Sequence, residues 1–325
     1  MNITRSILET YLNLTSISDA AIRKALNAMG ISARLRQNSV FCLEIPENRP
    51  DLLGFLGISR VLGACLGIPV IKPDAEWEDT DSCSIFQYLD VDVPAESCLR
   101  LSAKMAVNCH MGPSPDPLRK ILQSLGIAPR NSLQDLAAWV TLESGVPVDV
   151  WDLRCLRSDG LILRDAFPGE EAAGIPLPAG SPVFSDPDCT ARFPAGVTAP
   201  DLQEDSTDVV FLCGVFDPSR MEALPCHAFH HKALDPMATV PALERLCHLV
   251  QTLGLGEIPE GTLDNLNYVP QPRFLPLPGD LKRKTLEKLQ ILGFIPAEEG
   301  LEIPSFRQDI REEADLSLEI QKLSD

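Results

Sequence analysis

Between Val40 and Gly67 the sequence passes from a strand to a turn to a helix without a break. Val40–Ile45 has the composition of a β-strand, Pro46–Asp51 that of a turn, and Leu52–Leu66 that of a helix that Gly67 ends. This run is typical of a fold that mixes both kinds of element. Further helices are expected at residues 20–29, 116–126, 133–143, 242–253, 280–293 and 312–323, and strands at residues 161–164, 209–212 and 301–303. The sequence therefore predicts an α+β fold.

Composition suggests three units. We expect a small N-terminal α/β unit at residues 1–82, a mixed α/β unit at residues 83–256, and a linker with a winged-helix-like unit at residues 257–325. The first boundary follows the acidic stretch Asp74–Asp81, and a proline-rich connector after Gly256 marks the second. Inside the middle unit, residues 167–207 are rich in Pro, Gly, Asp and Ser, so long loops are expected there.

The charge balance limits the partners. The chain has 46 acidic and 28 basic side chains, a net charge of −18. Such a negative potential repels phosphate and disfavours an extended nucleic-acid footprint, so we expect weak RNA binding at most and no DNA binding. The one dense basic cluster, Lys282-Arg283-Lys284 with Lys288 on the same helix face, is a candidate RNA contact, and solvated helix surface is the alternative.

No apolar run approaches the ~20 residues that a membrane-spanning helix needs, and no secretory signal is visible. A cytoplasmic protein without a membrane partner is predicted. The ten cysteines are scattered with no C-x-x-C pair, so we expect reduced thiols. The segment Cys226–His231 suggests zinc, but zinc needs a second ligand pair nearby, so a polar loop is the favoured interpretation.

The turn after the early strand carries a long motif. Residues Glu44–Arg60 read E-I-P-E-N-R-P-D-L-L-G-F-L-G-I-S-R. This resembles the first domain of the phenylalanyl-tRNA synthetase β-subunit family, where an E-x-x-x-N-R-P-D-x-x-x-x-x-G-I-x-R-E run joins a strand to a helix. Arg49 offers donors to nearby carbonyls, and Pro50 and Asp51 start and cap the helix. We expect Asn48, Arg49 and Asp51 to form a structural joint; contact with a partner or RNA is the alternative.

Two further blocks resemble domains of the same family. Residues 112–147, which open with G-P-S-P, resemble its B3/B4 domain, and Pro304–Ile320 resembles its B5 domain. The resemblance covers nearly the whole chain and implies an α-like synthetase subunit as a partner. The family's oligonucleotide-binding-type insertion is missing at residues 31–48, and no catalytic-like or anticodon-binding module follows the B5-like segment. We therefore expect that the chain does not charge tRNA by itself.

The family's B3/B4 domain hydrolyses tyrosine wrongly attached to phenylalanine tRNA, which requires polar recognition groups and an oriented water. At the corresponding positions this chain has Ala138, Asp149, Gly196 and Leu212. Asp149 replaces the pocket histidine, Leu212 a carboxylate and Ala138 an asparagine, and Gly196 lies in a shortened glycine-rich segment. We predict a degenerate editing pocket and no catalytic residue.

The resemblance also implies a weakly held Mg²⁺ that B5 carboxylates share with the α subunit. Asp309 lies in the turn, and Asp315 and Glu319 are four residues apart on one helix face, so their oxygens could converge on a hard cation. A fourth expected acid is Leu318. Helix capping by Asp309, with Asp315 and Glu319 solvated, is the alternative.

Three functions remain open at this point. The first is a non-catalytic scaffold protein associated with a tRNA synthetase. The second is a stand-alone protein that binds an amino-acid-like small molecule in the degenerate pocket. The third is a hydrolase that edits misacylated tRNA in trans.

Overall fold

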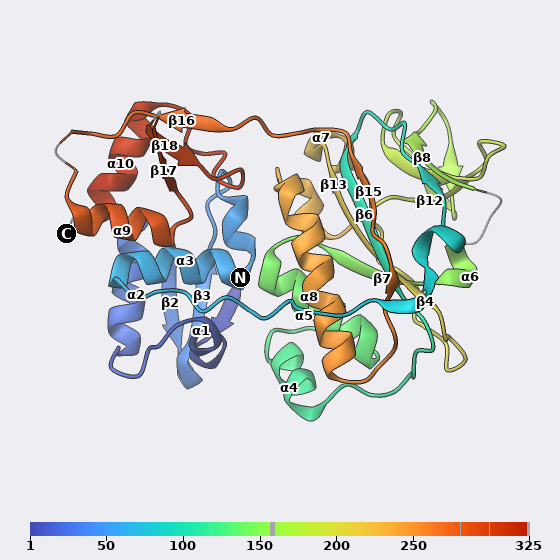
Figure 1. Cartoon of the computed structure of the whole chain (residues 1–325), viewed down its shortest axis with the longest axis horizontal. Helices are drawn as coiled ribbons and strands as arrows, with labels where there is room; N and C mark the ends of the chain where they lie inside the picture. The colour runs from blue at the N-terminus through green and yellow to red at the C-terminus, as the bar shows by residue number, and fades with distance from the viewer. Residues whose placement is uncertain (157–159, 280, 299, 324–325) are drawn as a thin grey trace. The chain divides into compact units, whose positions relative to one another are not determined.

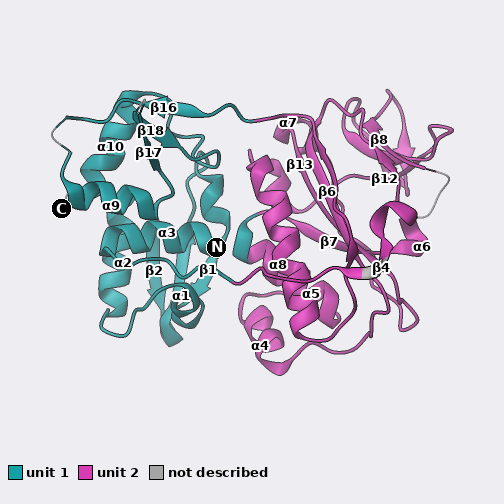
Figure 2. Cartoon of the chain, in the orientation of Figure 1, with its two compact units in different colours: residues 1–73, 143–145, 270–325 teal, residues 74–142, 146–269 magenta. Residues whose placement is uncertain are grey.

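The computed structural model describes residues 1–156, 160–279, 281–298 and 300–323 (Figure 1). Two compact units make up the chain (Figure 2). Unit 1 comprises residues 1–73, 143–145 and 270–325, and unit 2 comprises residues 74–142 and 146–269. The predicted mixture of helices and strands is confirmed. The division into three units is not confirmed, because the first and last segments of the chain share unit 1.

The first part of unit 1 is a three-stranded antiparallel sheet with three helices. The strand order is β1 (Asn2–Thr4), β3 (Val40–Glu44), β2 (Ser32–Arg36). The helices are α1 (Arg5–Tyr11), α2 (Asp19–Ala28) and α3 (Phe55–Leu66). The side chains of Thr4 and Ser18 accept backbone N–H groups in the first turns of α1 and α2.

The helix predicted from Leu52 to Leu66 is divided. A 3₁₀ turn, η2 (Pro50–Leu53), comes first, and Gly54, which is extended, separates it from α3. Gly67 ends α3 in the left-handed conformation with a φ of 69°, as the sequence predicts for a helix stop. The turn that carries Arg49 therefore lies against the start of α3.

The second part of unit 1 is a small sheet with two helices. The strand order is β16 (Arg273–Leu275), β18 (Gly300–Ile303), β17 (Ile295–Ala297), and the helices are α9 (Arg283–Ile291) and α10 (Glu313–Leu323). The helix α9 packs against both α10 and α3. The predicted order of helix, strand, turn and helix is present, although Asp280, where the first helix was predicted to begin, lies outside the described residues.

Unit 2 is built on a four-stranded antiparallel sheet. Its order is β15 (Leu263–Leu266), β6 (Cys98–Ala106), β13 (Val209–Phe216), β7 (Val148–Asp152). The helix α8 (Thr239–Thr252) packs on β6 and β13, and α4 (Asp116–Ser124) and α5 (Ser132–Ser144) precede β7 in the chain. All of these helices were predicted, whereas β6 and β7 were not.

A second sheet of unit 2 has the order β12 (Ala191–Pro194), β11 (Pro182–Ser185), β8 (Leu161–Asp165), β5 (Val91–Asp92). The two sheets share one hydrophobic core, to which β6 contributes Met105, β13 Leu212 and β11 Phe184. The segment predicted as long loops thus contains β11 and β12. Shorter elements of the described chain are β9 (Glu171–Ala172), β10 (Ile175–Pro176), α6 (Leu153–Leu156), α7 (Pro218–Met221), η1 (Gln37–Ser39), η3 (Ile85–Gln87), η4 (Ala228–His231) and η5 (Pro236–Ala238).

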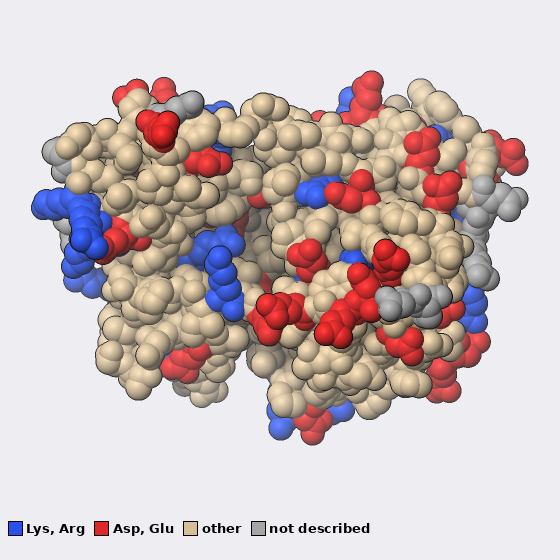
Figure 3. Space-filling model, in the orientation of Figure 1, with Lys and Arg blue, Asp and Glu red and all other residues tan. Residues whose placement is uncertain are grey.

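The acidic stretch after residue 73 is not a loose linker. It runs along α8 and enters β4 (Thr80–Ser84), which pairs with β14 (Pro259–Glu260). The carbonyls of Asp74, Glu76 and Glu78 accept hydrogen bonds from Arg245, His248 and Gln251 of α8, at 2.5, 2.6 and 2.5 Å. Acidic side chains gather over this part of unit 2 in Figure 3.

Within the described residues, no helix combines the length and the apolar character needed to cross a membrane.

Candidate functional site

The turn predicted as a joint is held by a buried ion pair. The guanidinium of Arg49 donates through Nε and Nη2 to the two carboxylate oxygens of Asp51, both at 2.8 Å. The side chains are only 6% and 4% exposed. Asn48, the third residue predicted for this joint, is exposed.

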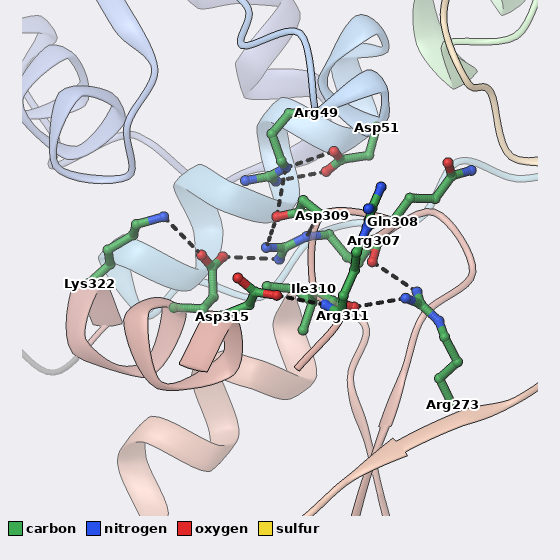
Figure 4. A network of polar contacts seen from close by, with 11 residues as sticks. Arg49, Asp51, Arg273, Arg307, Gln308, Asp309, Ile310, Arg311, Asp315 and Lys322 are labelled. Atoms are coloured by element: carbon green, nitrogen blue, oxygen red, sulfur yellow. Dashed lines mark hydrogen bonds and ion pairs between the residues drawn. The ribbon is translucent and has the colours of Figure 1, made fainter. Parts of the chain in front are cut away.

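A second arginine of unit 1 lies beside this pair (Figure 4). Arg307 donates to Asp309 through Nε and Nη2, at 2.8 and 2.9 Å, and to Glu319 through Nη1 at 3.0 Å. Its side chain and that of Glu319 are each 1% exposed. Nε of Arg49 lies 3.8 Å from Oδ2 of Asp309, which connects the two pairs. We call Arg49, Asp51, Arg307, Asp309, Glu319 and Lys322 the charge cluster.

Two carboxylates of the charge cluster, those of Asp309 and Glu319, are held in their ionised form. Burial by itself would raise the pKa of Asp309, but the hydrogen bonds and charge of Arg307 outweigh it and hold that pKa below its usual range. Burial would also raise the pKa of Glu319, and the charges of Arg307 and Lys322 lower it overall. Lys322 donates to Oε2 of Glu319 at 3.2 Å.

The predicted magnesium ligands do not share one open site. Asp309 and Glu319 both point to Arg307, whereas Asp315 accepts the backbone N–H groups of Arg311 and Glu312, at 2.9 and 3.2 Å. Among the residues that the structure describes, no group of three or more His, Cys, Asp or Glu side chains is arranged to hold a metal ion. These residues, as they are placed, do not fit a divalent cation.

Two of the predicted pocket positions are neighbours in unit 2. Asp149 of β7 lies directly opposite Leu212 of β13, so their side chains are on the same face of the sheet. Leu212 is part of the core between the sheets, and Asp149 is partly buried beside it. The backbone N–H of Ala199 donates to Oδ1 of Asp149 at 3.4 Å. Burial raises the pKa of Asp149 to about 7, since this amide and the charge of Arg130 offset only part of the cost of ionisation.

The other two pocket positions are differently placed. Ala138 is a partly buried residue of α5. Gly196 has a φ of +72°, and a Cβ there would lie 2.8 Å from Cδ2 of His230. The carbonyl of Gly196 accepts the N–H of His227 at 3.1 Å. The glycine segment is therefore packed closely against the histidine-containing turn.

His230 is a residue whose position the sequence did not predict. Its side chain is buried, it lies 5.3 Å from the Phe216 ring, and its Nδ1 has no hydrogen-bond partner among the described residues. Burial lowers the pKa of His230 to about 3, and the neighbouring histidines add to this effect. The buried ring is therefore neutral at physiological pH. The repeated histidines at 227, 230 and 231 were the one feature of the sequence that could have indicated a histidine in this place.

The basic cluster at α9 is smaller than predicted. Lys282, Arg283 and Lys284 are exposed, and Arg283 pairs with Glu287 at 3.0 Å. Basic side chains are visible at the surface in this part of unit 1 (Figure 3). Lys288 was wrongly predicted to extend the cluster, because its side chain is buried and its Nζ donates to the carbonyl of Leu323 at 2.7 Å.

The raised pKa of Asp149 predicts a free energy of unfolding that depends on pH. The folded chain keeps the proton up to about pH 7, whereas the unfolded chain releases it near 3.8, so stability falls as pH rises between these values. We expect Asp149→Asn to increase the free energy of unfolding by about 1–2 kcal/mol at about pH 8 and to change it little at about pH 5. Urea denaturation at both pH values measures this effect.

Asp152, in the same strand, provides the matched control. The hydrogen bonds of Arg154 lower the pKa of Asp152 to about 2, so its charged form stabilises the folded chain above 3.8. Asp152→Asn should therefore destabilise the chain at about pH 8, opposite in sign to Asp149→Asn. Equal effects of Asp149→Asn at the two pH values would contradict the prediction.

Comparison with known proteins identifies the domain in unit 2. Residues 97–254 match the model of the B3/4 domain. The phenylalanine–tRNA ligase beta subunit of Clostridium tetani is 26% identical over 316 residues, which are 88% of this chain and 40% of the relative. The corresponding subunit of Thermotoga maritima is 26% identical over 314 residues, 87% of this chain and 39% of the relative.

The beta subunit of Rhodopirellula baltica is 23% identical over 349 residues, which cover 97% of this chain and 51% of the relative. The chain thus spans between about two fifths and one half of the length of these relatives. The resemblance inferred from the motifs is confirmed, and the chain carries a B3/4 domain and is related over most of its length to phenylalanine–tRNA ligase beta subunits.

Proposed function

We propose that this chain is a non-catalytic, beta-subunit-like protein of tRNA aminoacylation, whose B3/4 domain serves as a scaffold and not as an editing hydrolase. The observation that carries the proposal is the pair formed by Asp149 and Leu212 across β7 and β13. It occupies two positions at which the resemblance expects polar recognition groups, and one of them is now an apolar core residue.

Ester hydrolysis needs a water held by hydrogen bonds and polar groups that recognise the acyl side chain. Leu212 can do neither, because its side chain has no polar atom. Burial raises the pKa of Asp149 to about 7, which by itself suits a general base, but its neighbour across the sheet, Leu212, supplies no polar group to hold the water. Gly196 is packed against the His230 ring, which leaves no room for a side chain there. These features support a structural role for the domain.

We propose as the second candidate that the region around Asp149, where the resemblance implies a pocket, binds an amino-acid-like molecule. A carboxylate that is partly buried among apolar side chains suits the ammonium group of such a ligand, because the paired charge offsets the desolvation that raises its pKa. A ligand of this kind should stabilise the wild-type chain against heat but not Asp149→Asn. Trans-editing of misacylated tRNA is the third candidate. It is less well supported, because Leu212 supplies neither a polar recognition group nor a group that holds the attacking water.

A deacylation assay tests the proposed function directly. We expect that the purified chain removes tyrosine from tyrosyl-tRNA of the phenylalanine acceptor no faster than buffer does. Release of labelled tyrosine with time is the measurement. Turnover that Asp149→Ala abolishes and Asp152→Ala keeps would overturn the scaffold proposal and establish trans-editing.

The proposal includes a synthetase α-like subunit as partner, and a cytoplasmic location follows from it. Contact with tRNA should be weak, through the exposed Lys282, Arg283 and Lys284, since the net charge is −18. Purification from native cells with mass spectrometry tests the partner. An α-like subunit in stoichiometric amount supports the proposal, and a chain isolated alone favours the ligand-binding alternative.

A further inference from the structure

The carboxylates of the charge cluster are saturated by side chains of this chain. Both oxygens of Asp309 accept from Arg307. One oxygen of Glu319 accepts from Arg307 and the other from Lys322. Both oxygens of Asp51 accept from Arg49. Each carboxylate oxygen of the charge cluster therefore already has a cationic donor.

The formal charges of the charge cluster balance. Its cations are Arg49, Arg307 and Lys322, and its anions are Asp51, Asp309 and Glu319. A magnesium ion is held by negative oxygen ligands and keeps several of its waters. The charge cluster offers neither excess negative charge nor solvent at its centre, where the side chains of Arg307 and Glu319 are 1% exposed.

The charge cluster connects segments from opposite ends of unit 1. Arg49 and Asp51 belong to the turn before α3, and the other members belong to the turn before α10 and to α10 itself. Arg273 of β16 donates to the carbonyls of Arg307 and Ile310, at 2.9 and 2.8 Å, and this fixes the second turn (Figure 4). Arg60 of α3 lies 4.6 Å from the centre of the Phe306 ring, which adds a second contact between the same segments.

We infer that the guanidinium of Arg307 is the resident cation of these carboxylates, and that it joins the two segments of unit 1 without a divalent metal ion. Leu318, which stands where the resemblance implies a further acid, is consistent with this inference. Leu318 is 58% exposed on α10 and supplies no oxygen. The inference is independent of the function proposed for the B3/4 domain, because every residue involved lies in unit 1.

The test compares thermal unfolding of the full chain in EDTA and in millimolar MgCl₂, together with a titration of Mn²⁺ followed by electron paramagnetic resonance. The wild-type chain should have the same Tm in both buffers and should leave the Mn²⁺ signal unchanged. Arg307→Met should lose on the order of 10 °C in Tm, because it removes the charged hydrogen bonds of a buried cation to Asp309 and Glu319. Part of this loss should be restored by Mg²⁺, which can then take the vacated place.

Arg311→Met is the matched control. Arg311 lies in the same turn but is exposed, and its Nε donates to the carbonyl of Gln308, at 3.2 Å. Its loss should leave the Tm unchanged in both buffers. An equal loss of Tm in the two variants would overturn the inference.

A second variant keeps the test decisive if Arg307→Met does not fold. Leu318→Glu adds the missing acid at an exposed position, where it should not disturb folding. With Arg307 in place it should still bind no Mn²⁺. Binding of one Mn²⁺ per chain by the wild type or by Leu318→Glu, lost on Asp315→Asn, would overturn the inference and establish a metal site.

Discussion

Gly57→Ala should lower the free energy of unfolding of unit 1 by roughly 3 kcal/mol or more, the largest effect of any single change considered. A Cβ at this position would lie 1.7 Å from the carbonyl oxygen of Asp51 and 2.8 Å from its carbonyl carbon. Both are backbone atoms, so no side chain can rotate away to relieve the contact. Either α3 or the turn η2 must move, and Arg49 and Asp51 would move with η2.

Thermal and urea unfolding measured by circular dichroism would show this effect. Gly279→Ala is the control in unit 1, because Gly279 is exposed and an added Cβ would meet no atom within 4 Å. The control should retain the wild-type stability within about 0.5 kcal/mol. If Gly57→Ala were as stable as Gly279→Ala, α3 would not lie as close to the Asp51 carbonyl as the structure places it.

Arg49→Ala is the second large effect, with an expected loss of about 3 kcal/mol. The variant removes both hydrogen bonds to Asp51 and the charge near Asp309, and it leaves the buried Asp51 carboxylate without its hydrogen-bonded cation. The cost comes mainly from this uncompensated charge and not from the energy of the ion pair itself. Urea denaturation at neutral pH measures the loss.

Arg34→Ala is the matched control for this variant. Arg34 pairs with Glu44 at the same distance of 2.8 Å, but these side chains are 76% and 65% exposed. An exposed pair of this kind contributes about 0–1 kcal/mol. An unchanged melting temperature of Arg49→Ala, combined with loss of a bound partner in a pull-down experiment, would instead show that the turn is an interaction site.

Local signals in the sequence predicted most helices correctly. Ser18 at the start of α2 and Gly67 at the end of α3 are residues with specific roles at helix ends, so the neighbouring sequence is sufficient to locate them. The start of α3 was placed too early because Pro50 and Asp51 favour a helix start, yet they begin a separate 3₁₀ turn. The extended Gly54 after that turn was not recognised as a break.

Errors arose where distant contacts decide the structure. The acidic stretch was interpreted as a linker because its charges are typical of solvated chain, but its backbone is bound by α8, far along the sequence. The strands β11 and β12 were missed because prolines, glycines and aspartates surround them. Their stability comes from pairing with β8 and from the core that they share with the other sheet.

The charge cluster was predicted in part. Arg49 and Asp51 were identified as a joint, and Asp309 and Glu319 as residues that come together, but Arg307 was not assigned to either group. The sequence did contain a pattern that indicates the role of Arg307, since Arg49-Pro-Asp51 and Arg307-Gln-Asp309 have the same spacing. In each segment the arginine donates two hydrogen bonds to the aspartate two residues later. Which cation those carboxylates hold depends on how the two turns meet, and no local pattern encodes that.

The discontinuity of unit 1 determines the order in which the chain can fold during synthesis. Residues 1–73 are synthesised before residues 143–145 and 270–325, which complete their unit, and residues 74–142 and 146–269 are made in between. Residues 1–73 therefore cannot complete their packing until α9 has been synthesised, and until then the face of α3 that α9 covers is exposed. Contacts of such long sequence separation slow folding, because a large loop must close before they form. The nascent chain is thus most prone to aggregation while the B3/4 domain is being translated.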